Sequence, residues 1–154
     1  MLMLDLCCGV KGASGPMVNR GWSVVTVDAR PGVDPDIIAD VKEWRWRGKR
    51  PDLIWCTPPI IGTKQPDLTA FLGCMRIINE ARPRFWVVEG DRNAVYWLTP
   101  HLGRPAYVHN PYFLYGSFPH LEQVRAKGTS EKFAIANKIA VAIEESLVFQ
   151  EVLI

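Results

Sequence analysis

The sequence has no apolar run that approaches the roughly 20 residues needed by a membrane-spanning helix. Its apolar start, Met1 to Leu6, is short and contains Asp5, so we do not expect a signal peptide. Internal repeats, low-complexity tracts and linker-like stretches are also missing. These absences predict a cytoplasmic protein without a membrane partner.

Cysteine and histidine are scarce, with four and three residues. The adjacent pair Cys7 and Cys8 cannot easily form a local disulfide, and Cys56 and Cys74 lie in apolar segments instead of a disulfide framework. The histidines lack the spacing of metal ligands, and the cysteine pair has no matching second pair. We therefore predict reduced cysteines and no bound metal.

Neither sign of charge dominates, since the formal net charge is +2. Composition alone therefore does not indicate nucleic-acid binding. One basic stretch, Lys42 to Arg50, interleaves cations with Trp44 and Trp46. These indoles could stack on bases, or they could anchor the end of a helix to a sheet, and both interpretations stay open.

Apolar residues make up 48% of the 154 positions, which is enough for a single domain over residues 1–154 with a substantial core. Short, continuously apolar runs alternate with helical or loop segments as far as about Trp97, as is typical of strands buried on both sides. We predict an α/β fold with a mostly parallel sheet and helices on both faces. The expected strands are Leu2 to Leu6, Ser23 to Val27, Ile37 to Ala39, Leu53 to Cys56 and Phe85 to Val88.

Two helices and a hairpin complete the expected fold. The first helix follows Asp67, which can cap it, and ends before Pro83. The second runs from about Ser130 to Leu147. Its expected core face consists of Phe133, Ala136, Ala140, Ile143 and Leu147. Between Pro100 and His120, short apolar pieces predict a C-terminal antiparallel hairpin.

Polar residues lie where these strands end. Parallel strands with right-handed connections end along one edge of a sheet. This edge should gather Asp5, Asp28, Asp40, Thr57 and Glu89. The turn after the first strand contains Gly9 and Gly12, which let the main chain approach a ligand closely. Asp28 follows roughly 20 residues later, where a carboxylate can accept the hydroxyls of a ribose, so the pattern predicts a nucleoside-binding site.

Other interpretations stay open. Asp28 could cap the turn at residues 30–32, and Asp40 could cap the segment after it. No Gly-Lys-Ser/Thr follows the turn, which excludes a Walker loop, and Lys11 stands where a dinucleotide fingerprint prefers glycine. An NAD-type oxidoreductase remains an alternative, because it would share the ribose acid. Asp5 is costly to bury without a partner, so we expect a cationic ligand group or the amides of the turn to meet it.

The motifs together resemble a known family. The segment Leu4 to Gly12, Leu-Asp-Leu-Cys-Cys-Gly-Val-Lys-Gly, is similar to the cofactor motif Asp-Leu-Phe-Cys-Gly-x-Gly-Gly of DNA cytosine-5 methyltransferases, particularly their short phage- or prophage-type members. Asp28, Asp40-Val41, Pro58-Pro59 and Val88-Glu89 match later motifs of that family in order. The resemblance covers nearly the whole chain.

The resemblance implies a Rossmann-like S-adenosylmethionine methyltransferase fold, a bacterial or phage-infected host cell, DNA as a partner, and a cytosine flipped into a pocket beside the cofactor. It implies a catalytic role for Glu89, which would bind the ring, alongside a cysteine thiolate that attacks carbon 6. No separate target-recognition domain is expected. The residues implied for cofactor binding are Asp5, Cys8, Gly9, Gly12, Asp28, Ala29, Asp40, Val41 and Pro58.

The chain departs from this family at the nucleophile, because Ile60 follows Pro58-Pro59 where the cysteine should stand. Cys56 could supply a replacement thiol. Alternatively, Thr57-Pro58-Pro59-Ile60 is similar to the Asp/Asn/Ser-Pro-Pro-aromatic motif of amino-group methyltransferases, although the aromatic residue is missing. A third interpretation is an inactive relative that binds DNA, a partner protein or a second copy of itself.

Overall fold

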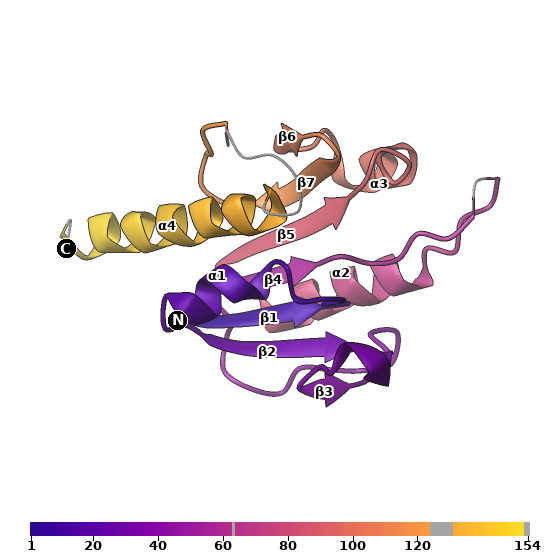
Figure 1. Ribbon diagram of the computed structural model, residues 1–154, viewed down its shortest axis with the longest axis horizontal. Coiled ribbons are helices and arrows are strands. Elements are labelled where there is room, and N and C mark those ends of the chain that lie inside the picture. Colours follow the sequence, from indigo (N-terminus) through magenta and orange to yellow (C-terminus); the bar gives the residue numbers. More distant parts are fainter. Residues whose placement is uncertain (63, 124–130, 153–154) are drawn as a thin grey trace.

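The computed structural model describes residues 1–62, 64–123 and 131–152, the last three of these without their side chains (Figure 1). The elements in chain order are β1 (Leu2–Leu6), α1 (Ser14–Asn19), β2 (Ser23–Asp28), a short 3-10 helix (Pro31–Val33), β3 (Ile37–Ile38), β4 (Leu53–Cys56), α2 (Thr69–Ala81), β5 (Phe85–Gly90), α3 (Val95–Leu102), β6 (Tyr107–His109), β7 (Tyr112–Ser117) and α4 (Glu131–Val152). No helix in this part of the chain is both long and apolar enough to cross a membrane.

The strands form one sheet of seven in the order β3-β2-β1-β4-β5-β7-β6. Strands β1 to β5 pair in parallel, whereas β7 runs antiparallel to both β5 and β6. The predicted α/β class, the five parallel strands and the C-terminal hairpin are therefore confirmed. Of the two hairpin strands, the second, β7, pairs with β5. The first strand, β6, therefore forms the edge of the sheet.

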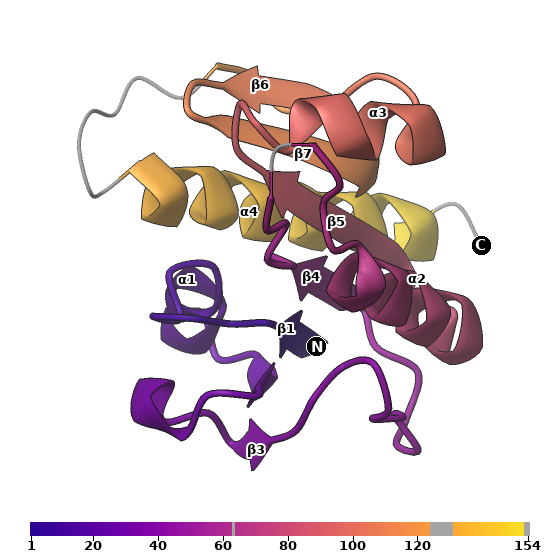
Figure 2. The same ribbon diagram turned by 90° about the vertical axis from the view of Figure 1, so that its right-hand side faces the viewer.

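Helices cover both faces of the sheet (Figure 2), as predicted. Successive strand side chains point to opposite faces, so Met3 and Leu53 pack with α1 and α4, whereas Leu4 and Ile54 pack with α2. Figures 1 and 2 both show α4 beside α1. This division decides which strand residues can meet, because a side chain on one face does not reach the other.

The predicted helices form with adjusted details. In α2, Asp67 Oδ1 accepts the Thr69 amide at 2.9 Å, so the capping expectation is met from just outside the first turn. Helix α4 extends beyond Leu147, and its predicted start at Ser130 lies outside the described residues. Phe133 is 42% exposed, which corrects its assignment to the core face.

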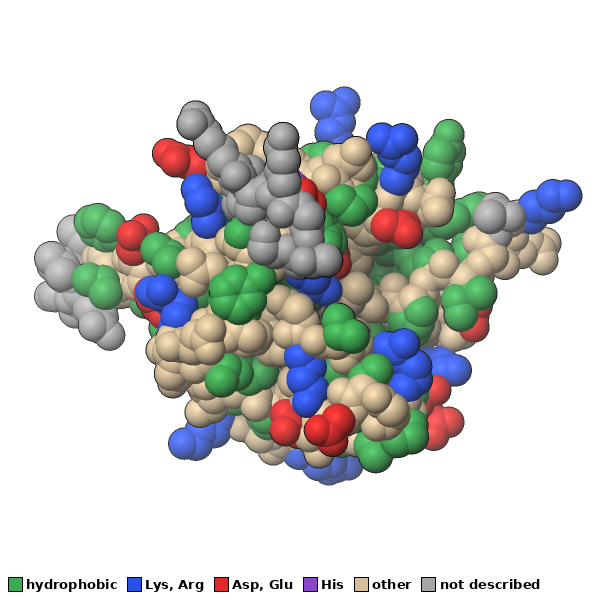
Figure 3. Space-filling model, viewed as in Figure 1, with side chains coloured by type: hydrophobic (Ala, Val, Ile, Leu, Met, Phe, Trp, Pro, Cys, Tyr) green, Lys and Arg blue, Asp and Glu red, His purple; other side chains and the backbone are tan. Residues whose placement is uncertain are grey.

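Helix α3 was missed, and the basic stretch is not helical. Pro100 lies inside α3, so this helix extends into the segment for which only a hairpin was expected. Trp44 and Trp46 are half-buried and pack at the edge of the α2-side core, with ring centroids 6.2 Å apart. This packing favours the anchoring interpretation. On the face seen in Figure 3, acidic and basic side chains are interspersed instead of forming one charged patch.

Candidate functional site

The predicted polar residues do meet at the carboxyl edge of the parallel strands. Asp28 ends β2, Asp40 follows β3, Thr57 follows β4 and Glu89 lies near the end of β5. Asp5 lies one residue before the end of β1. Two pockets open along this edge, and we call them the large pocket and the small pocket.

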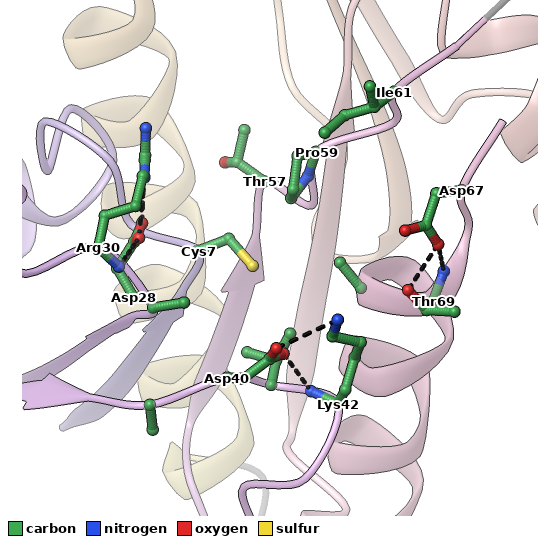
Figure 4. A pocket seen from close by; sticks show the side chains of 14 residues that line it. Cys7, Asp28, Arg30, Asp40, Lys42, Thr57, Pro59, Ile61, Asp67 and Thr69 are labelled. Carbon is green, nitrogen blue, oxygen red and sulfur yellow. Dashed lines mark hydrogen bonds and ion pairs between the residues drawn. The ribbon is translucent and has the colours of Figure 1, made fainter.

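The large pocket, of about 410 Å³, brings Asp28 and Asp40 together (Figure 4). Ala29 and Val41 also line it, so four of the residues predicted for cofactor binding share one cavity. The close-up shows Asp28 on one side and Asp67 on the other, with Asp40 between them at the lower edge. Its walls combine small apolar side chains with a few convergent polar groups, as is usual for small-molecule sites. The alternative that Asp28 and Asp40 are unrelated surface caps is therefore disfavoured.

The carboxylate of Asp28 is fully engaged by neighbours. Its Oδ1 accepts Arg30 N at 2.9 Å and Arg30 Nε at 3.0 Å, and its Oδ2 accepts Gly9 N at 3.0 Å and an Arg30 terminal nitrogen at 3.1 Å. Burial by itself would raise the pKa of Asp28, but the hydrogen bonds from Arg30 and Gly9 outweigh it and lower the pKa. A carboxylate has about four acceptor positions. A further ligand hydroxyl therefore has to displace the exposed guanidinium of Arg30.

Asp40 has a smaller set of partners. Its Oδ1 accepts Lys42 N at 2.9 Å, and the Lys42 ammonium lies 3.2 Å from Oδ2. Both side chains are nearly half exposed and line the large pocket. Asp40 does cap the local chain, as one interpretation proposed, yet it also faces the cavity.

The turn after β1 is shaped by left-handed backbone. Gly9 has φ +51°, and Lys11 adopts φ +59° although it carries a side chain. This left-handed conformation is uncommon for residues other than glycine. The turn therefore forms even though a lysine stands at position 11. Cys8 N donates to Val27 O at 3.2 Å, and burial raises the pKa of the Cys8 thiol to about 11. Cys8 and Gly9 thus fix the turn against β2 without lining the large pocket.

Gly12 has a different neighbour from the one predicted. It does not line the large pocket, and a Cβ added to it would lie 3.1 Å from Cδ of Lys132 on α4. This glycine makes room for a lysine side chain, and its expected cofactor contact stays a prediction. The sequence did not reveal this contact between Gly12 and Lys132, because the two residues lie far apart along the chain.

Asp5 is the least satisfied polar residue in the described part of the chain. It is 1% exposed, and its Oδ2 is the only fully buried side-chain oxygen or nitrogen there without a hydrogen-bond partner. Burial raises its pKa to about 7, and the nearby Lys132 ammonium and Ser14 hydroxyl offset only part of that effect. The expected rescue by amides of the turn is not seen. An unpartnered buried oxygen is what a cationic ligand group could satisfy, but Asp5 lines neither pocket.

The small pocket, of about 250 Å³, adjoins the large one. Glu89, Pro58 and Ile60 line it, and Thr57 and Pro59 line both pockets. Pro58 was expected to contact the cofactor, but the structure places it in the small pocket instead. Two ligands bound side by side would therefore meet at Thr57 and Pro59.

Glu89 is held by two donors that the sequence did not reveal. Trp55 Nε1 donates to Glu89 Oε2 at 3.0 Å, and the Lys132 ammonium lies 3.1 Å from the same oxygen. Glu89 is 7% exposed, so it would be costly to bury without these partners. Trp55 precedes Cys56 in β4, and only the sheet register shows that it faces Glu89.

Cys56 does not reach either pocket. It follows Trp55 in the strand, so its side chain lies on the opposite face of the sheet. It is fully buried on the α2 side, next to Cys74. This corrects the interpretation of Cys56 as a replacement nucleophile, because a thiol buried on the α2 side of the sheet cannot attack a base held beside Glu89. The described residues contain no group of three or more Cys, His, Asp or Glu side chains suited to a metal ion.

Comparisons with known proteins support the fold. The sequence matches no protein-family model and no curated protein. A protein assigned as a DNA modification methyltransferase and encoded within a prophage of E. coli has a similar structure, with TM-score 0.53, 16% identity and 76% of this chain aligned. The aligned part spans 46% of that protein. A protein from Pyrococcus horikoshii OT3 gives a TM-score of 0.43 at 20% identity over 70% of this chain and 56% of its own.

The strand order, the position of the antiparallel strand and the similarity to the prophage protein agree with one another. The chain has a Rossmann-like methyltransferase fold.

Proposed function

We propose that this protein binds S-adenosylmethionine in the large pocket and a flipped DNA base, cytosine, in the small pocket. When bound, S-adenosylmethionine supplies an electrophilic methyl group. The observation that carries the proposal is the pair of adjoining pockets, which share Thr57 and Pro59, with Asp28 in one and Glu89 in the other. A cofactor and a base bound in this way would lie next to each other at the carboxyl edge.

The residues of the large pocket fit an adenosyl group. Asp28 is placed to accept ribose hydroxyls once Arg30 turns away, and Ala29, Val41 and Ala70 offer an apolar wall for the adenine ring. Asp5 does not line this pocket, so its unpartnered Oδ2 is not assigned to the ligand. The adenosine part of the ligand thus has chemically matched groups.

The cofactor proposal predicts opposite effects of two neighbouring substitutions. Asp28→Ala removes a charged acceptor and should weaken binding of S-adenosylmethionine by about a hundredfold. Arg30→Ala removes the competitor for Asp28 and should strengthen binding by about three- to fivefold, since exposed ion pairs contribute under about 1 kcal/mol. Isothermal titration calorimetry with S-adenosylmethionine, its demethylated product and NAD measures both effects. Binding of NAD alone would favour the oxidoreductase alternative and contradict the proposal.

Methyl transfer is tested separately at the small pocket. If the protein is active, labelled S-adenosylmethionine should transfer its methyl group to DNA, and Glu89→Gln should slow the transfer by about a hundredfold because the charge at the base is lost. Tyr96→Phe, at an 82% exposed position, is a suitable control that should leave the rate unchanged. Turnover that is equal in Glu89→Gln and the parent protein would contradict the role of Glu89.

A second candidate, binding without catalysis, is favoured by one observation. Ile60 lines the small pocket, and no cysteine is among the described residues around it. The adduct with carbon 6 of cytosine needs a thiolate. In that case we expect the protein to bind cofactor and DNA with no incorporation over a broad panel of DNA substrates, and a clear turnover would exclude this candidate.

A further inference from the structure

A lysine on the C-terminal helix α4 stands directly behind the small pocket. The Lys132 ammonium lies 3.1 Å from Glu89 Oε2 and donates to Thr57 Oγ1 at 3.5 Å, and both Glu89 and Thr57 line that pocket. The Lys132 side chain is 21% exposed, so its charge is largely removed from water. An ion pair in this setting is stronger than one on the surface.

Two donors converge on one oxygen of Glu89. Oε2 receives both the Trp55 indole N–H and the Lys132 ammonium. This arrangement fixes the orientation of the carboxylate. No donor from the described residues occupies the other oxygen, Oε1, which is left for a ligand of the small pocket.

The turn after β1 makes room for this lysine. A Cβ at position 12 would lie 3.1, 3.5 and 3.6 Å from three successive carbons of the Lys132 side chain. Contacts as close as the first require the neighbour to shift. The missing side chain of Gly12 therefore makes room for the lysine that holds Glu89, whereas the left-handed backbone of Gly9 shapes the turn itself.

We propose that Lys132 is a positioning residue for the target base. It orients the Glu89 carboxylate so that Oε1 faces the small pocket, and Gly12 admits its side chain. A carboxylate paired with an ammonium only accepts hydrogen bonds. The matching ligand is a base that turns an amino or imino N–H toward Glu89. This proposal rests on the proposed function, because it assigns a base to the small pocket.

The test separates base positioning from cofactor binding. Lys132→Met keeps the length of the side chain without its charge and should lower the rate constant of methyl transfer at least tenfold, with the dissociation constant for S-adenosylmethionine unchanged. Lys132→Arg should restore part of the rate. Lys138→Met, a lysine on the same helix, is the matched control and should behave like the parent protein. Equal transfer rates in Lys132→Met and the parent protein would overturn the proposal, as would an equal loss of cofactor affinity.

Gly12 gives a second, coupled measurement. Gly12→Ala should lower the transfer rate by displacing Lys132. It should have no further effect on the rate in a Lys132→Met background, because the ammonium whose displacement slows transfer is already absent. Additive effects of the two substitutions would contradict the link between Gly12 and Lys132. So would a loss of cofactor affinity in Gly12→Ala.

The ion pair can also be tested without activity. Lys132→Met should lower the midpoint of thermal unfolding, because a nearly buried carboxylate loses its partner, and adding Glu89→Gln should restore much of it. If S-adenosylmethionine does not bind and no methyl is transferred, the proposed function fails, whereas this restoration still supports the pairing of Lys132 with Glu89. Lack of restoration overturns the positioning role on its own.

Discussion

At pH 8, the Asp5→Asn variant should be more stable to unfolding than the parent protein by about 4 kcal/mol, and the two should approach each other near pH 4. The folded protein raises the pKa of Asp5 from 3.8 to about 7. The folded state therefore holds a proton that the unfolded state releases between these values, so this residue makes stability fall as pH rises through the window. Three pH units of difference correspond to about 4 kcal/mol. Denaturant titrations of both proteins from pH 4 to pH 8 measure it.

The opposite sign is expected at a matched aspartate. Asp36 Oδ2 accepts both Thr26 N at 2.8 Å and Thr26 Oγ1 at 2.7 Å, and these bonds lower the pKa of Asp36. The ionised form stabilises the fold above the ordinary aspartate pKa, and that contribution is lost as pH falls through the lowered value. Asp36→Asn should thus destabilise the protein near neutral pH. Parallel pH profiles for the parent protein and Asp5→Asn would show that Asp5 has a partner in solution.

A second large effect is expected at Gly116 in β7. Its φ is +139°, and a Cβ there would lie 2.1 Å from the carbonyl oxygen of Trp86 in β5. The main chains of Gly116 and Trp86 belong to paired strands, so neither can move away without disturbing the pairing of β5 with β7. Gly116→Ala should therefore destabilise the protein by about 3–5 kcal/mol, the range of severe core substitutions.

Gly32 provides the control for this substitution. No heavy atom lies within 4 Å of a Cβ built there, and its φ is not in the left-handed region. Gly32→Ala should change stability by no more than about 0.5 kcal/mol, as is usual at unconstrained surface positions. Circular dichroism during denaturant unfolding measures both variants. A Gly116→Ala variant as stable as Gly32→Ala would mean that β7 does not approach β5 as closely as described.

The sequence carried enough information for the parallel part of the sheet. Runs such as Leu53 to Cys56 and Phe85 to Val88 are short, apolar on every residue and separated by turns, which is a local signature of strands buried on both faces. The gathering of the polar residues at the strand ends could also be predicted, because parallel strands with right-handed connections end at one edge. The shared pocket of Asp28 and Asp40 is a consequence of that rule.

Local patterns failed where a residue's meaning depends on distant chain. Pro100 reads as a helix breaker, yet it lies in α3, and Phe133 reads as core although it is 42% exposed. Gly12 matched a cofactor motif, while its neighbour in space is Lys132. Propensity and spacing carry no information about which element will pack against them.

The sequence by itself determined which groups lie at the carboxyl edge: a glycine turn, Asp28, Asp40, Pro58-Pro59 and Glu89. Only the tertiary structure decided which side chains share a face. Alternation along β4 sends Trp55 to Glu89 and Cys56 to Cys74, and the packing of α4 on α1 brings Lys132 to the carboxylate. The reason is physical: hydrophobic periodicity acts over a few residues, whereas the contacts that complete the site join segments that become neighbours only when both faces of the sheet are buried.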